Sequence, residues 1–276
     1  MVFIRKYFLE IQTISNFAPQ NDASTMAKFT EEQKTYNRIK KRFSKATKDY
    51  ALLADGDKIL VALSGGKDSL TLLQLLAERS RILRPHIEIE AAHVSMLNIP
   101  YKSDIAFLQD FCNRLGVTLH LASTSFNAET DTRKSPCFLC SWNRRKALFE
   151  IAQERGCNKI ALGHNLDDFI ETMLMNITFQ GAFSAMSPLM KMEKFPISII
   201  RPLCLVNESD VEQHARNCAF PAQKKNCPHE NSSNRKQMKD LLARLDVLNP
   251  EARYNIWGAM SNIQADLLPP KIAKKQ

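Results

Sequence analysis

Residues 58–69 read Lys-Ile-Leu-Val-Ala-Leu-Ser-Gly-Gly-Lys-Asp-Ser, and this stretch decides the fold. After Lys58, its first half is an unbroken apolar run, which is typical of a strand covered on both faces of a parallel sheet. The leucines that follow Ser69 recur at helical spacing. A tight turn at 64–69 therefore joins a buried strand to an apolar-faced helix.

The turn has the composition of a phosphate-binding loop. Its adjacent glycines let the backbone approach an anion closely, and the amides of the following helix N-terminus can receive phosphate oxygens. Lys67 adds a positive charge, and Asp68 supplies a carboxylate suited to Mg²⁺. Only 8 glycines occur in 276 residues, so an adjacent pair favours a binding loop over an ordinary capped turn. We expect the whole loop to bind nucleotide phosphates: Ser64, Gly65, Gly66, Lys67, Asp68 and Ser69.

Predicted strands and helices alternate after this loop. Apolar runs predict strands at 87–94, 117–121, 159–162 and 197–201, and helical patterns predict helices at 105–115, 142–155 and 167–178. This alternation indicates an α/β fold, a Rossmann-like doubly wound parallel sheet. Ligands in such sheets bind beyond the carboxyl ends of the strands, where the 64–69 loop lies.

The chain divides into four predicted segments. Residues 1–28 read as a flexible lead-in without a secretory signal, and 29–54 as a basic helix. Residues 55–205 form the nucleotide-binding domain, followed by a helical C-terminal region at 206–276. The basic helix is interpreted either as a solvated face or as a contact for an RNA backbone.

The composition indicates which partners and which compartment to expect. The chain has 38 Lys and Arg against 29 Asp and Glu, a net charge of +9 that favours phosphate-rich partners such as nucleic acid. No apolar run approaches the length of a membrane helix, so we expect no membrane association. We expect a cytoplasmic protein whose 7 cysteines are reduced.

A second polar motif begins at Gly163 and His164, directly after the predicted strand at 159–162. Asp167 and Asp168 follow at the start of the next helix, where carboxylates act as N-terminal caps or bind Mg²⁺. Both strand ends belong to one sheet, so this motif should face the same crevice as the phosphate loop. We therefore expect Gly163 and His164 to contact the nucleotide, and the two aspartates to place Mg²⁺.

Cys137 and Cys140 form a Cys-x-x-Cys pair ahead of the predicted 142–155 helix. By itself the pair fits a redox couple, half of a zinc site, part of an iron–sulfur site, or two structural cysteines. Cys227, in a polar segment containing Pro228, is the best distant third ligand, and His229 could complete a Cys₃His zinc site. A cluster held by three cysteines would leave one iron open for chemistry. The other thiols are expected to be packing residues: Cys112, Cys157, Cys204 and Cys218.

These blocks occur in the order found in the tRNA 2-thiocytidine synthetase (TtcA) family of the PP-loop ATP pyrophosphatase superfamily. The chain resembles that family over about 37–263, including Pro136-Cys137-Phe138-Leu139-Cys140 with Arg144-Arg145, and Gly181 to Pro188. It departs from many relatives at Asn165, which replaces a histidine. It also carries a single cysteine, Cys227, where relatives often have a second Cys-x-x-Cys.

The resemblance implies an ATP-dependent tRNA sulfurtransferase with Mg²⁺ and a [4Fe–4S] cluster on Cys137, Cys140 and Cys227. The C2 oxygen of an anticodon-loop cytidine would be adenylated and then replaced by sulfur. The implied partners are tRNA, bound through Arg144, Arg145 and the basic helix, and a sulfur donor such as a cysteine desulfurase, and a homodimer is compatible with the family. The alternatives are another PP-loop adenylating enzyme, of the 2-thiouridine or lysidine type, with structural zinc, and a zinc-stabilised RNA-binding module without activity.

Overall fold

The computed structural model describes residues 29–99, 103–126, 135–193, 195–222 and 234–269. The predicted lead-in at 1–28 and the third candidate ligand, Cys227, lie outside these residues. Within the described residues, no helix is both long and apolar enough to cross a membrane.

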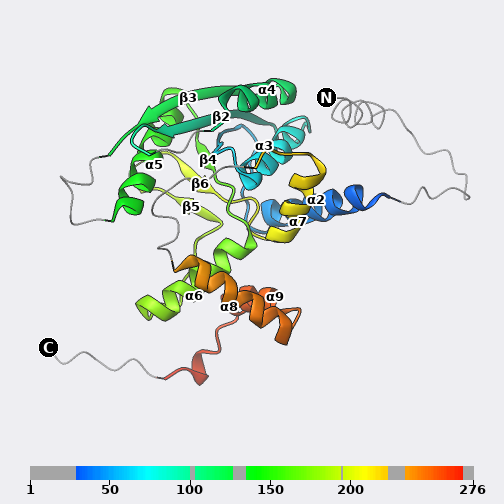
Figure 1. Cartoon of the computed structure of the whole chain (residues 1–276), viewed down its shortest axis with the longest axis vertical. Helices are drawn as coiled ribbons and strands as arrows, with labels where there is room; N and C mark the ends of the chain where they lie inside the picture. Colours follow the sequence, from blue (N-terminus) through cyan, green and yellow to red (C-terminus); the bar gives the residue numbers. More distant parts are fainter. Residues whose placement is uncertain (1–28, 100–102, 127–134, 194, 223–233, 270–276) are drawn as a thin grey trace, which may run out of the picture.

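A six-stranded sheet forms the centre of the molecule, in the order β3-β2-β1-β4-β6-β5 (Figure 1). Five strands are parallel to their neighbours, and β5 pairs antiparallel with β6 at one edge. The predicted Rossmann-like α/β fold is therefore confirmed. The strands are β1 (Asp57–Ala62), β2 (Ile87–Met96), β3 (Thr118–Thr124), β4 (Lys159–Ala161), β5 (Leu189–Lys191) and β6 (Ser198–Ile200).

The central strand β1 is buried on both faces because its side chains alternate between two cores. Ile59 and Val61 pack into a core shared with helices α3 and α4, whereas Leu60 packs into a second core with α5. This explains why its sequence is continuously apolar. The helices are α2 (Glu31–Asp49), α3 (Lys67–Ser80), α4 (Ile105–Leu115), α5 (Pro136–Glu154), α6 (Leu166–Gln180), α7 (Glu208–Asn217), α8 (Arg235–Leu248) and α9 (Ala252–Ala259), with a 3₁₀ turn at Ala265–Leu267.

The basic helix α2 is part of the main core. Tyr36, Ile39 and Phe43 are buried in the same core as β1 and α3. Most of its cations have partners within the protein: Lys34 with Glu31, Arg38 with Asp210, Lys40 with Glu78, Lys45 with Asp49, and Arg42 with Leu205, Asn207 and Tyr254. Arg38, Lys40 and Arg42 therefore anchor the helix to the body, whereas the ion pairs of Lys34 and Lys45 lie within the helix itself.

Helix α5 begins at Pro136, so the prediction of a start at residue 142 was wrong. Ser135 accepts a hydrogen bond from the amide of Phe138 and caps the helix, and Pro136 occupies its first position, where proline is well tolerated. Cys137 and Cys140 consequently lie inside the first turns of α5, one turn apart.

The C-terminal helices pack beside α6 at one end of the sheet (Figure 1). Leu166 and Ile170 of α6 and Leu242 of α8 form a small core with Tyr254 and Trp257 of α9. This contact places the N-terminus of α8 near the N-terminus of α6, where the second polar motif lies.

Candidate active site

The phosphate loop is closed by its own serines. The amide of Gly65 donates to Oγ of Ser69 at 3.2 Å, and that hydroxyl donates to the carbonyl oxygen of Gly66 at 2.9 Å. Gly65 has φ 88°, a left-handed conformation that favours glycine. Gly66 caps α3 without a side-chain hydrogen bond, so the first backbone amides of the helix can bind an anion.

Gly163 brings the second motif into direct contact with the loop. A Cβ atom added at this position would lie 3.1 Å from the carbonyl carbon of Asp68 and from the amide nitrogen of Ser69. In addition, Nδ2 of Asn165 donates to Oδ1 of Asp68 at 2.9 Å. The two strand ends therefore meet, and a glycine is needed where their backbones touch.

The two aspartates of the second motif have different surroundings. Asp168 exchanges capping hydrogen bonds with Asn165, and burial raises the pKa of its carboxyl group. Asp167 accepts the backbone amide of Glu208 at 2.8 Å and Nε of Arg253 at 2.7 Å, one on each oxygen. Asp167 thus connects α6 with α7 and α9, whereas Asp168 remains beside the phosphate loop.

Lys67 lies between two carboxylates. Its Nζ is 3.1 Å from Oδ2 of Asp68 and 3.0 Å from Oε1 of Glu208. Although burial opposes the charge, these carboxylates raise the pKa of Lys67, which stays protonated. Sequence reasoning missed Glu208, because its only local feature is its position in the first turn of α7.

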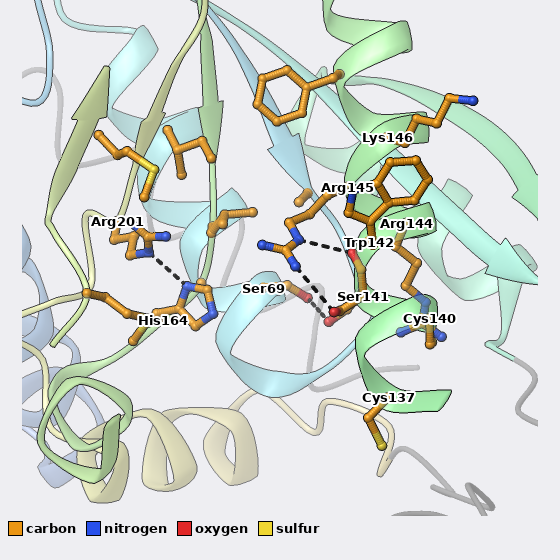
Figure 2. Close-up of a pocket in the computed structure, with 18 of the residues that line it drawn as sticks. Ser69, Cys137, Cys140, Ser141, Trp142, Arg144, Arg145, Lys146, His164 and Arg201 are labelled. Atoms are coloured by element: carbon orange, nitrogen blue, oxygen red, sulfur yellow. Dashed lines mark hydrogen bonds between the residues drawn. The ribbon is translucent and has the colours of Figure 1, made fainter. Parts of the chain in front are cut away.

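One pocket of about 1010 Å³ is lined both by residues of the phosphate loop and by the Cys137–Cys140 pair (Figure 2). His164 lies on one side of it, and Cys137 and Cys140 of α5 lie on the other (Figure 2). Ser64, Asp68 and Ser69 of the phosphate loop also line it. Its charged lining comprises four cations and one carboxylate: Arg144, Arg145, Lys146, Arg201 and Asp68. None of the lining residues comes from α2.

His164 enters this pocket as a neutral imidazole. Burial lowers its pKa to about 4, and the charges of Arg201, Arg235 and Arg145 act in the same direction. Nε of Arg201 donates to Nδ1 of His164 at 3.3 Å (Figure 2). Because Nδ1 accepts this bond, the proton of the neutral ring resides on Nε2.

The described cysteines fall into two groups. Cys137 is exposed and Cys140 is partly exposed, and both line the pocket. The other four described cysteines do not line it, and burial raises the pKa of Cys112, Cys157 and Cys218 to about 11 and that of Cys204 to about 12. The geometry therefore separates thiols suited to ligation from thiols that pack.

Comparison with known proteins identifies the family. The PP-loop domain family matches residues 35–241. The tRNA-cytidine(32) 2-sulfurtransferase of Geotalea daltonii is 38% identical over 239 residues, which cover 84% of this chain and 94% of that protein. The chain belongs to the tRNA-cytidine(32) 2-sulfurtransferase family. The Syntrophotalea carbinolica family member is 39% identical over 239 residues, covering 84% of this chain and 92% of its own.

A solved structure resembles this member of the tRNA-cytidine(32) 2-sulfurtransferase family in fold. It is the U34-tRNA thiolase NcsA from Methanococcus maripaludis with its [4Fe–4S] cluster, which aligns with a TM-score of 0.68 and 26% identity. The alignment covers 84% of this chain and 81% of the thiolase. The family resemblance stated from the sequence motifs is thus confirmed.

Proposed function

We propose that this protein uses ATP to convert a cytidine of the tRNA anticodon loop into 2-thiocytidine. The observation that carries the proposal is the shared pocket, in which the phosphate loop and the Cys137–Cys140 pair line one cavity. Adenylation and sulfur delivery must act on the same C2 position of one base. A single cavity that holds an anion site and a thiol pair suits that requirement.

The phosphate loop would hold the pyrophosphate of ATP. The uncapped amides of α3 and the charge of Lys67 neutralise the leaving pyrophosphate as the C2 oxygen attacks the α-phosphorus. Asp68 and Asp168, which both bond Asn165 beside the loop, would hold Mg²⁺ against the phosphates, whereas Asp167 bonds Glu208 and Arg253. The C2 oxygen then leaves as part of AMP when sulfur replaces it.

The thiols suit an iron–sulfur cluster. Cys137 and Cys140 are one turn apart at the N-terminus of α5, where the helix dipole favours thiolates. The four cations of the pocket favour a negatively charged group beside them. We assign Cys227 as the third ligand, in line with the sequence. When bound, the cluster would carry sulfur from the donor to the base through the iron that has no protein ligand.

Two further side chains, His164 and Arg145, would contact the RNA substrate in the pocket. Nε2–H of His164 can donate a hydrogen bond toward a ligand in the pocket, with Arg201 holding the ring in that tautomer. Arg145 lines the pocket, with its Nε donating to the carbonyl oxygen of Ser141 and its Nη2 donating to Oγ of the same residue. We place the reaction in the cytoplasm, where a reducing environment keeps the thiols available, with a cysteine desulfurase as sulfur donor.

Mass spectrometry of tRNA nucleosides tests the function. Cells that contain the protein should form 2-thiocytidine, and cells that lack it, or carry Cys137→Ser, should not. Cys218→Ala is the matched control, because this thiol lies outside the pocket. Unchanged 2-thiocytidine without the protein would refute the proposal. A colourless, zinc-containing protein after anaerobic purification would instead favour the alternative adenylating enzyme.

A further inference from the structure

Trp142 is a large exposed aromatic side chain in the pocket wall. It is 50% exposed and lies on α5, two residues after Cys140. The other tryptophan, Trp257, contacts the rings of Phe169 at 5.2 Å and Tyr50 at 6.1 Å. Across the described ranges, Trp142 makes no such ring contact. An indole in this position has a free face for a planar ligand.

The helix that carries Trp142 also carries cations in excess of what ATP needs. Arg144, Arg145 and Lys146 lie two to four residues after Trp142 and line the pocket, whereas the phosphate loop already provides amides and Lys67 for the nucleotide. These donors match additional phosphates, as a polynucleotide would bring.

We infer that Trp142 is a stacking platform for an unpaired base of the RNA substrate, with Arg144, Arg145 and Lys146 binding the flanking phosphates. The inference rests on the proposed function and locates the RNA beside the cysteine pair. Proteins recognise single-stranded loops by stacking splayed bases on aromatic side chains, with basic residues along the backbone. Trp142 and the two cysteines line the same pocket from one helix, which locates the platform in the cavity that holds the thiols.

Tryptophan fluorescence of the cluster-containing protein tests this inference directly. An anticodon stem-loop RNA should quench the emission, because a base stacked on Trp142 contacts its indole. In Trp142→Phe the RNA-dependent quenching should disappear, since the remaining Trp257 packs against Phe169. Equal quenching in wild type and Trp142→Phe would overturn the inference. Quenching by ATP alone, without RNA, would also overturn it and assign the platform to adenine.

Steady-state kinetics give a second readout. Loss of one base–aromatic stack should raise KM for tRNA about 10-fold in Trp142→Ala, with a smaller change in kcat, and Trp142→Phe should restore most of the affinity. Phe179→Ala is the matched control, because Phe179 is 55% exposed on α6 but does not line the pocket. An unchanged KM in Trp142→Ala, or an equal increase in Phe179→Ala, would contradict the inference.

The two proposals can fail separately. If wild type forms 2-thiocytidine but RNA leaves Trp142 unquenched, the stacking inference falls and the function stands. If wild type forms no 2-thiocytidine and RNA still quenches Trp142, the function falls and the RNA-binding platform is supported.

Discussion

Lys67 and Glu208 form an ion pair that joins the phosphate loop to α7, with 3.0 Å between Nζ and Oε1. The other oxygen of Glu208 is 2.6 Å from Nζ of Lys239 on α8. The backbone amide of Glu208 donates to Asp167. One residue therefore links the phosphate loop, the second polar motif and the C-terminal helices.

Replacing Glu208 by glutamine should destabilise the fold by about 2 kcal/mol near pH 7, because two cations lose a partly buried carboxylate. Its pKa is lowered in the folded protein: burial opposes ionisation, but Lys239 and Lys67 outweigh it. The stabilisation is thus present above the unfolded pKa of about 4.5 and is lost as pH falls through the lower folded value.

Thermal unfolding across pH measures this effect. The difference in Tm between wild type and Glu208→Gln should be largest near neutral pH and shrink in acid. Glu212→Gln, on the same helix, provides the control and should change Tm little. A constant difference at all pH values would exclude the ion pair as its cause.

Gly163→Ala should impair nucleotide use with little effect on the rest of the fold. The new Cβ would press on the backbone of Asp68 and Ser69 at 3.1 Å, so the phosphate loop must move away from the strand end. A displacement of reacting groups by a fraction of an ångström commonly costs 10-fold or more in rate, and we expect about that loss in kcat/KM for ATP. Gly258→Ala is the control, because nothing lies within 4 Å of its Cβ position. Normal ATP turnover in Gly163→Ala would show that the contact is not needed.

Glu171→Gln should stabilise the protein at alkaline pH. Burial, reinforced by Asp168, raises the pKa of Glu171 to about 7, so the folded state holds a proton that the unfolded state releases near 4.5. Stability is therefore lost as pH rises from about 4.5 to 7, and the full penalty persists above 7. The variant should gain on the order of 1 kcal/mol at pH 8, a rise of about 2 to 4 °C in Tm, and much less at pH 4. A gain that is equal at pH 4 and pH 8 would point to a cause other than ionisation.

Arg201→Gln should raise the pKa of His164 above its present value of about 4. The value would not return fully to 6.5, because burial is the larger cause of the depression. Histidine NMR titration measures the shift, and the acid limb of the pH–rate profile should move to higher pH with it. His214 is the internal control, since burial alone lowers its pKa to about 4 and Arg201 is not among the causes. No shift in His164 would mean that Arg201 does not act on the ring.

Hydrophobic patterns in the sequence predicted the sheet. They also predicted that the phosphate loop and the motif beginning at Gly163 face one crevice. The apolar run at 59–63 is unambiguous because both faces of β1 are buried, and Ile59 and Leu60 enter different cores. The crevice followed from topology, since parallel strand ends share one edge. Strand β5 was missed because three residues, Leu189–Lys191, are too few to show a period, and Met190 is 37% exposed.

Pairings between distant residues could not be predicted from the sequence. Asp167 resembled Asp168 as a candidate Mg²⁺ ligand, and only the fold shows that Arg253 and the amide of Glu208 occupy its oxygens. The start of α5 is marked by Ser135 and Pro136, which are ordinary signals of a helix N-terminus, whereas the Cys-x-x-Cys motif between them and Trp142 has no helical pattern of its own.

The bond between Arg253 and Asp167 has a consequence for protein engineering. Chimeras that exchange the C-terminal helices between relatives would alter the surroundings of the phosphate loop, because these helices bond Asp167 and Glu208. A successful exchange must transplant Glu208, Lys239 and Arg253 as a set, because each has its partner on another element. These helices therefore cannot be treated as an interchangeable cassette.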